Sequence, residues 1–254
     1  MAQPHGERAH RVEAPSLAAC MTPPEAFQRA LNSLRIELSA QEIEQLGRFI
    51  HALLSANARF NLTAVTDPAE AWMRHGYDSL TLLPYLLAAE AEQVVDIGSG
   101  GGLPAIPLAI ALPGASMTLV ESTGKKAAYL RETAESLGLQ NVEVLADRAE
   151  ILGQDRERFR ERFDVATARA VGRLPVLLEL MAPLVRPGGV LLAIKGEQAM
   201  EELAEARRAL AELRVQHVDS SRTETGTVVV MRKSGRTPRT YPRKPGEPKR
   251  VPLR

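Results

Sequence analysis

The chain has 254 residues, 44% hydrophobic and 25% charged, which is ordinary for a globular protein with one large domain. Its single cysteine, Cys20, excludes an internal disulfide and a multi-cysteine metal cluster, and we expect no metal site. The cysteine usage also favours a reducing compartment, so we expect a cytoplasmic protein. No run of about 18 apolar residues is present, and the sequence therefore predicts no membrane span.

The formal net charge of +1 hides an uneven distribution of charge along the chain. The stretch from Arg232 to Arg254 contains nine Lys and Arg residues against one Glu, so the remainder is acidic overall. A basic terminus on an acidic body indicates a polyanionic partner, although a solvated terminus without a partner has the same composition.

The N-terminal third is predicted to be helical. Residues 1–22 lack the apolar core of a signal peptide and are interpreted as a disordered extension. Residues 23–88 are expected to form a small helical cap. Within it, "SAQE" at 39–42 is a capping box, and the apolar residues from Ile43 to Leu53 repeat at helical spacing.

The sequence then changes to short apolar segments. Strands are predicted at 93–97, 116–121, 142–145, 163–168, 190–195, 214–220 and 226–233, with helices between the first five. This alternation predicts an α/β fold with a mostly parallel sheet covered on both faces. Residues 183–189, "PLVRPGG", are expected to be a loop before the fifth strand, and the last two strands an antiparallel hairpin.

A glycine-rich loop follows the first strand in "QVVDIGSGGGLPAIPLAIAL". Glycines allow close approach of a ligand, and ligands of such sheets lie at the carboxyl ends of the strands. Asp96 precedes this loop and suits a cationic or amino ligand, whereas Glu121 ends the second strand, where an acid binds ribose hydroxyls. A dinucleotide fingerprint counted from Gly100 places Ala105 at its last position, so NAD stays an alternative to S-adenosylmethionine.

Four motifs in order carry a more specific resemblance: "RFNLTAVTDPAEAWMRHGYDSL", "DIGSGGGLPAIPLAI", "DVATARAV" and "YPRKPGEPKRVPL". From about residue 25 to the C-terminus the chain resembles the ribosomal small-subunit methyltransferase G family, also called glucose-inhibited division protein B. The departures are small: Ala105 replaces a usual Gly, and "ARAVG" replaces "SRAVA".

The resemblance implies a class I (Rossmann-like) S-adenosylmethionine-dependent methyltransferase with a seven-stranded sheet. The implied domains are a cap at 23–88, a methyltransferase domain at 89–233 and a basic tail at 234–254. The implied reaction is methylation of N7 of one guanine, position 527 of 16S rRNA, in the small ribosomal subunit or an assembly intermediate. Together with the loop analysis, it assigns cofactor binding to Asp96, Gly98, Gly100, Leu103, Glu121, Ser122, Thr123, Ala149, Glu150 and Arg169.

The chemistry is compatible with this reaction. A cytosine C5 methyltransferase needs a catalytic cysteine near the fourth strand, and Cys20 lies far from it in the sequence. The Asn/Asp-Pro-Pro-aromatic motif of amine methyltransferases is replaced by "ATARAVGRL". Guanine N7 carries a free lone pair and needs no base, so positioning suffices. Arg169 and Lys195, at the ends of the fourth and fifth strands, are the positioning candidates.

We expect the RNA to contact two groups of residues: Asn61, Arg74, His75, Asp78 and Lys195 around the cleft, and Arg243, Lys244, Lys249 and Arg250 in the tail. The prolines of the tail disfavour a helix, and we expect it to become ordered on RNA. Trp72 is interpreted as a core residue. We expect a monomer.

Three other functions remain open from the residues alone. They are an NAD-linked oxidoreductase, a ribosome-binding protein that has lost activity, and a small-molecule methyltransferase. The first lacks a recognisable catalytic pair near a strand end, and the intact Gly98, Glu121 and Arg169 argue against the second. The basic tail disfavours the third.

Overall fold

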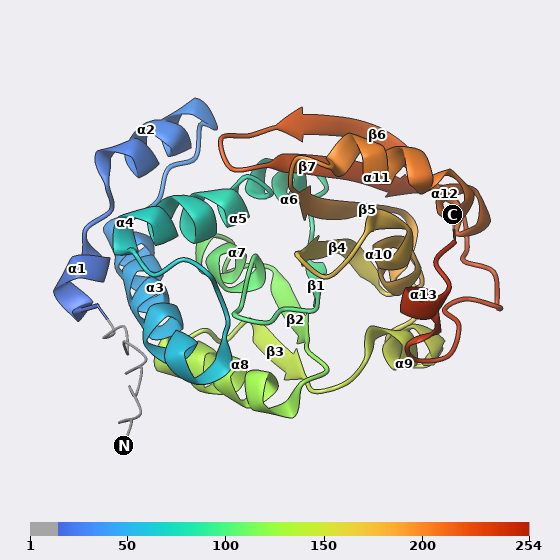
Figure 1. Ribbon diagram of the computed structural model, residues 1–254, viewed down its shortest axis with the longest axis horizontal. Coiled ribbons are helices and arrows are strands. Elements are labelled where there is room, and N and C mark those ends of the chain that lie inside the picture. The colour runs from blue at the N-terminus through green and yellow to red at the C-terminus, as the bar shows by residue number, and fades with distance from the viewer. Residues whose placement is uncertain (1–14, 254) are drawn as a thin grey trace, which may run out of the picture.

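The computed structural model describes residues 15–253 and shows one seven-stranded sheet between two layers of helices (Figure 1). The strands are β1 (Gln93–Ile97), β2 (Ser116–Val120), β3 (Val142–Leu145), β4 (Phe163–Arg169), β5 (Val185–Lys195), β6 (Val215–Arg222) and β7 (Thr227–Lys233). Their order is β3-β2-β1-β4-β5-β7-β6. The predicted fold class is confirmed: β1 to β5 are parallel, and β7 pairs antiparallel with both β5 and β6.

The expected loop at 183–189 is wrong in its extent, because β5 already begins at Val185. Phe163 pairs with Val185, but Val165 pairs with Val190, so the β5 strand carries extra residues at this point. Gly188, with φ of +88°, adopts the left-handed conformation that lets the chain bulge and then rejoin the sheet.

Helices cover both faces of the sheet, and the alternation of side chains along each strand explains why. In β1, Val94 belongs to the core on one face, whereas Val95 and Ile97 belong to the core on the other. The first face is covered by α2 (Glu25–Ser33), α3 (Ala40–Phe60), α4 (Pro68–Ala71), the π-helix η1 (Trp72–Tyr77), α5 (Asp78–Leu80), α6 (Leu83–Ala88), α7 (Ala105–Ala111) and α8 (Gly124–Ser136). The second is covered by α9 (Ala149–Gln154), α10 (Leu174–Met181), α11 (Ala199–Glu205) and α12 (Arg207–Glu212).

The N-terminal helices share one hydrophobic core with the sheet. Leu46 and Leu53 of α3 are fully buried in the same cluster as Val94 and Leu119. Trp72 is also fully buried there, as expected for a core residue. Residues 23–88 therefore form a layer of the fold rather than a cap with its own core.

The disordered extension predicted at 1–22 is wrong for its last residues. Residues 1–14 lie outside the described part of the chain, but Leu17–Met21 form the short helix α1, which packs on α3. Its Cys20 is buried, and the carbonyl of Cys20 accepts a hydrogen bond from Trp72 Nε1 at 3.0 Å. The capping box of Ser39 and Glu42 at the start of α3 is confirmed.

The C-terminal segment is folded against the second helical layer, which corrects the expectation of a tail without helix that becomes ordered on RNA. The helix α13 (Glu247–Arg250) forms with Pro248 near its first position, where the missing N–H costs nothing. Pro242 packs so closely on Gly153 that a Cβ there would approach it to 2.9 Å. The next residue, Arg243, pairs with the buried Glu179 of α10.

Candidate cofactor and substrate site

The glycine loop after β1 requires glycine for two separate reasons at Gly98. Its φ of +69° is a conformation that L side chains rarely adopt. A Cβ on Gly98 would also lie 2.8 Å from Cγ2 of Val171, in the loop after β4. The backbone of the β1 loop and the loop after β4 are thus in direct contact beside the cavity described below.

Glu121, the residue after β2, fixes the shape of this loop. One carboxylate oxygen accepts the Gly100 N–H at 3.0 Å, and the other accepts the Thr123 N–H at 2.7 Å. The side chain is buried, yet each carboxylate oxygen retains a lone pair for a further donor. Glu121 is therefore placed to accept hydroxyl groups of a ligand while it holds the two loops together.

Asp96 precedes the glycine loop, where the sequence predicts a carboxylate within reach of a ligand, but its side chain is buried in the protein. It is 2% exposed, and its Oδ1 accepts the Thr167 hydroxyl of β4 at 2.7 Å. Among the described residues, Oδ2 has no hydrogen-bond partner. Burial raises the pKa of Asp96 to about 7, because a charge removed from water is destabilised. An unsatisfied buried carboxylate oxygen is a place for a cation or donor from a ligand.

A cavity of about 400 Å³ opens beside Gly98 at the carboxyl ends of β1 and β2. Its floor and sides include Ile97, Gly98, Val120, Ser122, Ala149 and Glu150, which come from the predicted cofactor segments. The C-terminal segment supplies a further wall through Gly246, Pro248, Lys249 and Pro252. The Gly246 N–H donates to the Glu150 carboxylate at 2.8 Å and fixes that wall in place.

Six of the predicted cofactor residues do not line this cavity: Asp96, Gly100, Leu103, Glu121, Thr123 and Arg169. Leu103 is partly buried and packs against the core of the first face instead. Arg169 lines a second cavity of about 340 Å³, together with Asp78, Lys195 and Thr225. The loop that begins at Ala170 separates the two cavities, because Val171 and Gly172 line the first. Arg169 therefore lies on the side of this loop that faces the second cavity.

Arg169 is held by two predicted substrate residues. Its Nε lies 3.2 Å from Asp78 Oδ2, and Nη2 lies 3.5 Å from His75 Nδ1. Thr225 donates to the other oxygen of Asp78, and Thr63 pairs with His75 Nε2 at 2.7 Å. His75 and Asp78 are both 3% exposed. Asp78 lines the second cavity beside Arg169, whereas His75 does not line it and supports Arg169 from behind.

The environment of His75 makes it a poor proton acceptor. Burial, followed by the positive charge of Arg169, lowers its pKa to about 4. The ring is therefore neutral at physiological pH, and both ring nitrogens have neighbours on the protein. His75 positions Arg169 through this contact.

Lys195 is also committed to the protein. Its Nζ lies 2.7 Å from the Glu202 carboxylate and donates to the Gly172 carbonyl at 2.7 Å. The same Glu202 accepts the N–H of Leu174, the first residue of α10. Lys195 thus fixes the loop between the two cavities, and its side chain is only 9% exposed.

The other predicted RNA residues fall into two groups. Asn61, Arg74, Lys244, Lys249 and Arg250 are exposed, and Arg74 has only a 3.7 Å contact with Glu70. The expectation that Arg243 contacts RNA needs correction, because its guanidinium hydrogen-bonds to Glu179 and is not free for a phosphate group. A lone carboxylate in the apolar stretch "LPVLLELM" was the available signal, because buried charges need a partner.

The sequence analysis missed several residues of the site. Thr167 of β4 contributes its hydroxyl to Asp96, and Thr225, in the turn between β6 and β7, contributes its hydroxyl to Asp78. Single threonines far away in the sequence give no signal of their own. The wall formed by Gly246, Pro248 and Pro252 was also missed, because the tail was treated only as an RNA-binding segment.

Comparison with known families decides the identity of this fold. Residues 42–229 match the family of rRNA small subunit methyltransferase G (GidB). The chain belongs to this methyltransferase G family. "Ribosomal RNA small subunit methyltransferase G" of Sorangium cellulosum is 50% identical over 223 residues, covering 87% of this chain and 92% of that protein. The protein of the same name from Leuconostoc citreum is 40% identical over 236 residues, covering 90% and 98%.

Solved structures show the same fold at low sequence identity. An O-methyltransferase from Bacillus cereus in complex with SAH has a TM-score of 0.56 and 21% identity, covering 82% of this chain and 97% of that one. The O-methyltransferase TomG from Streptomyces achromogenes in complex with SAM gives 0.56 and 18%, covering 83% and 96%. The chain is a class I methyltransferase, and its cofactor is S-adenosylmethionine.

The residues present fit this cofactor. The apolar walls Ile97 and Val120 suit a flat base, and Gly98 allows close approach of the backbone to a ligand. Glu121 and Asp96 do not line the cavity themselves, but each is the sequence neighbour of a lining residue, and Asp96 Oδ2 is unsatisfied. A cavity of about 400 Å³ is within the usual range of roughly 300–1,000 Å³ for small-molecule sites. In the described part of the chain, no helix is long and apolar enough to cross a membrane.

Proposed function

We propose that this methyltransferase of small-subunit rRNA transfers the methyl group to N7 of one guanine, position 527 of 16S rRNA. The observation that carries the proposal is the second cavity, which adjoins the cofactor cavity across the loop from Ala170 to Arg173 and offers no free buried base. At its base, Asp78 is paired with Arg169 and Glu202 with Lys195, while Glu197 is exposed to solvent. Guanine N7 has no proton to remove, so this cavity suits it.

The bound cofactor supplies an electrophilic methyl group on a sulfonium. The chain's own residues orient the acceptor and exclude water. A guanine ring becomes cationic on N7 methylation, and the near-neutral Arg169–Asp78 pair avoids strong repulsion of that charge. Thr225 and His75 hold the pair in one geometry, which is how positioning lowers a barrier.

For the target base to reach this cavity, it has to leave its stack, as for other enzymes that modify bases. Arg74 of η1 and Lys249 of α13 are both exposed. Their positive charges support contacts to the phosphates that flank the target base. We further propose that the chain acts as a cytoplasmic monomer on the small subunit or its assembly intermediate.

The test is methyl transfer from labelled S-adenosylmethionine to small subunits isolated from a strain without this activity, followed by nuclease mapping of the label. Label on N7 of one guanine is the expected result, and a Gly98→Asp variant should abolish it. Label on a pyrimidine or on an exocyclic amine would refute the proposal.

An Arg169→Lys variant separates positioning from cofactor binding. Lysine keeps the charge but loses the planar fork that contacts Asp78 and His75 together. We expect a fall in kcat of roughly tenfold or more, by analogy with misplacement of positioning groups, and an unchanged affinity for S-adenosylmethionine by calorimetry. A loss of cofactor affinity instead would place Arg169 in the cofactor site.

A further inference from the structure

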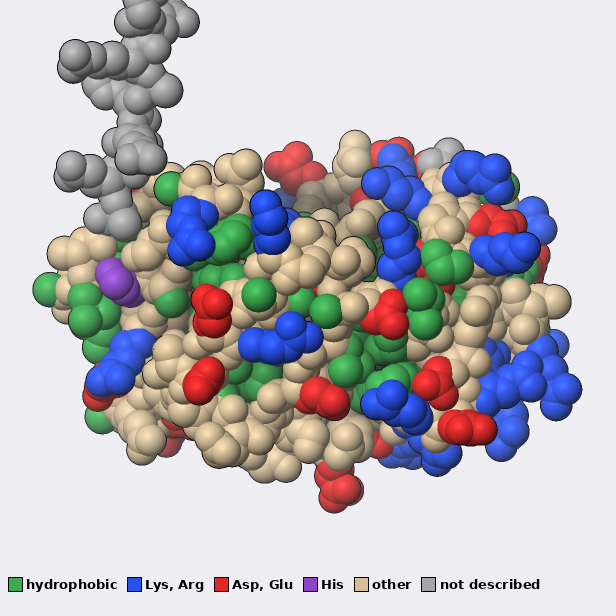
Figure 2. All heavy atoms as spheres, turned by 90° about the horizontal axis from the view of Figure 1, so that it is seen from below, with side chains coloured by type: hydrophobic (Ala, Val, Ile, Leu, Met, Phe, Trp, Pro, Cys, Tyr) green, Lys and Arg blue, Asp and Glu red, His purple; other side chains and the backbone are tan. Residues whose placement is uncertain are grey.

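A basic surface that lines neither of the two cavities lies at the edge of the sheet where the parallel strands begin. Phe163 opens β4, Val185 opens β5 and Lys233 ends the antiparallel β7, so the adjoining loops meet at this edge. The loop after β7 lies at the right-hand end of the molecule in Figure 1, and Lys and Arg side chains gather at the same end in Figure 2. We name Arg156, Arg162, Arg214, Arg236 and Arg239 the amino-edge arginine cluster.

The cluster surrounds a hollow of about 710 Å³. Among the described residues, its lining holds six arginines, the five of the cluster and Arg160, against one carboxylate, Glu161. Glu161 is engaged by Lys233 at 3.5 Å and by the Thr237 N–H at 2.8 Å, and it reaches Arg236 only at 4.0 Å. The arginines therefore retain most of their charge toward solvent.

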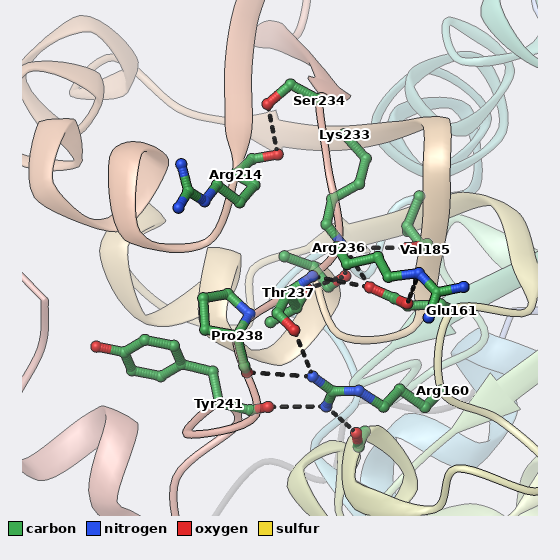
Figure 3. A network of polar contacts seen from close by, with 12 residues as sticks. Arg160, Glu161, Val185, Arg214, Lys233, Ser234, Arg236, Thr237, Pro238 and Tyr241 are labelled. Atoms are coloured by element: carbon green, nitrogen blue, oxygen red, sulfur yellow. Dashed lines mark hydrogen bonds and ion pairs between the residues drawn. The ribbon is translucent and has the colours of Figure 1, made fainter.

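Arg160 shows that this surface has a fixed shape. Its guanidinium donates to four main-chain carbonyls, those of Gly153, Thr237, Pro238 and Tyr241, at 2.7 to 3.2 Å (Figure 3). Lys233 is buried beneath the same loop and donates to the carbonyls of Ala182 and Val185. The loop from Arg236 to Arg239 is thus anchored from inside while its two arginines point outward, Arg236 with 87% of its side chain exposed.

Five like charges held at one edge repel one another and destabilise the free protein, unless an anion neutralises them. Guanidinium groups match phosphate oxygens with paired hydrogen bonds, and such contacts position a nucleic acid without reading its sequence.

The surface of the cluster is also continuous with the cofactor cavity. A neighbouring hollow shares Arg156 and Arg239 with the cluster, and extends along the C-terminal segment to Lys244 and Glu247, next to the cofactor wall at Gly246.

We propose that the amino-edge arginine cluster binds the phosphate backbone of the substrate RNA at a distance from the modified base, and so orients the subunit on the enzyme. This inference rests on the proposed function for its choice of RNA as the partner. The C-terminal segment then connects two contacts on the same RNA, one at the target base and one at the amino edge.

The experiment compares Arg236→Gln/Arg239→Gln with a control of equal charge loss, Arg29→Gln/Arg48→Gln. The control arginines lie on α2 and α3, are exposed, and form only i,i+4 surface pairs. Binding to unmodified small subunits is measured by filter retention at several KCl concentrations. Methyl transfer, cofactor affinity and thermal unfolding are measured in parallel on the full-length protein.

The cluster variant should bind roughly tenfold more weakly near physiological salt, and the slope of log K against log salt should fall by about 2, one unit for each lost phosphate contact. The value of kcat at saturating subunits and the cofactor affinity should match the control, and the melting temperature should be no lower than that of the control, because two mutually repelling charges are removed. An Arg236→Lys/Arg239→Lys variant should keep the salt slope. Binding by the cluster variant equal to that of the control would overturn the inference.

Binding is measured without methyl transfer, so this test stands apart from the test of the reaction. If the wild type binds subunits but methylates a different base, the proposed function fails while the cluster remains testable. If the cluster variant loses cofactor affinity or melts at a lower temperature, these arginines act through the fold, and the inference is wrong.

Discussion

Arg243 lies against Glu179 with three side-chain hydrogen bonds, at 2.6 to 3.2 Å, and its backbone N–H donates to the same carboxylate at 2.9 Å. Glu179 is fully buried in α10. This pair connects the C-terminal segment to the sheet domain, and that segment forms one wall of the cofactor cavity. An ion pair outside the site therefore governs the shape of the site.

An Arg243→Ala substitution should destabilise the fold and weaken cofactor binding together. It leaves the Glu179 carboxylate buried without its partner, which typically costs about 3–5 kcal/mol. Urea unfolding should show this loss, and calorimetry a weaker affinity for S-adenosylmethionine. Lys244→Ala, at the exposed neighbour, is the matched control and should change neither. An Arg243→Ala protein as stable as that control would contradict the role assigned to the pair.

The steric requirement at Gly98 can be separated from its backbone requirement. Gly98 and Gly100 both have positive φ, but a Cβ at Gly100 would have only the Gly98 carbonyl nearby, at 3.7 Å, whereas one at Gly98 would overlap Val171. We expect Gly98→Ala to bind S-adenosylmethionine at least about tenfold more weakly than Gly100→Ala, the equivalent of an overpacking cost of about 1.4 kcal/mol.

A second substitution tests the contact directly. Val171→Ala in the Gly98→Ala background removes the overlapping methyl groups and should restore part of the affinity. If both alanine variants bind alike and Val171→Ala restores nothing, the cofactor affinity does not depend on this contact.

The raised pKa of Asp96 predicts a pH-dependent stability. Its carboxyl titrates near 7 in the folded protein and near 3.8 when unfolded, so the unfolded state loses its proton first. The stability that this group contributes is present below pH 3.8 and is lost as the pH rises through 7. The free energy of unfolding of Asp96→Asn relative to wild type should therefore increase by up to about 4 kcal/mol between pH 4 and 8. A pH-independent difference would contradict the burial argument.

His75 predicts a pH effect in the opposite direction. Its pKa of about 4 lies below the ordinary 6.5, so the unfolded state binds a proton that the folded state excludes. Stability should fall by up to about 3 kcal/mol as the pH drops from 6.5 to 4, and His75→Gln should remove this slope. The exposed His217 provides the control variant, His217→Gln, which should keep it.

The central strands could be predicted from the sequence because β1, β2 and β4 are short apolar runs whose two faces are both buried. The bounds of β1 and β3 agree with the predicted ranges. The start of β5 could not be predicted, because "RPGG" has the composition of a turn, and only pairing with β4 keeps it in the sheet.

The candidate site divides in the same way. Gly98 and Glu121 lie in contiguous motifs; Gly98 lines the cavity, and Glu121 accepts the N–H of Gly100 in the same loop. Arg169 and Asp78 were both noticed, but their contact joins β4 to a helix about 90 residues earlier, and no local pattern encodes such a pairing. The prediction for the tail counts its charges as free, whereas Arg243 is engaged by the buried Glu179.

The cofactor cavity takes its floor from residues near 97–150 and one wall from residues 246–252. A molecule bound there touches both segments, and so acts as a removable cross-link between the first half of the sheet and the end of the chain. Amide hydrogens of α13 should then exchange more slowly when the cavity is filled, which makes the C-terminal segment a reporter of cofactor occupancy.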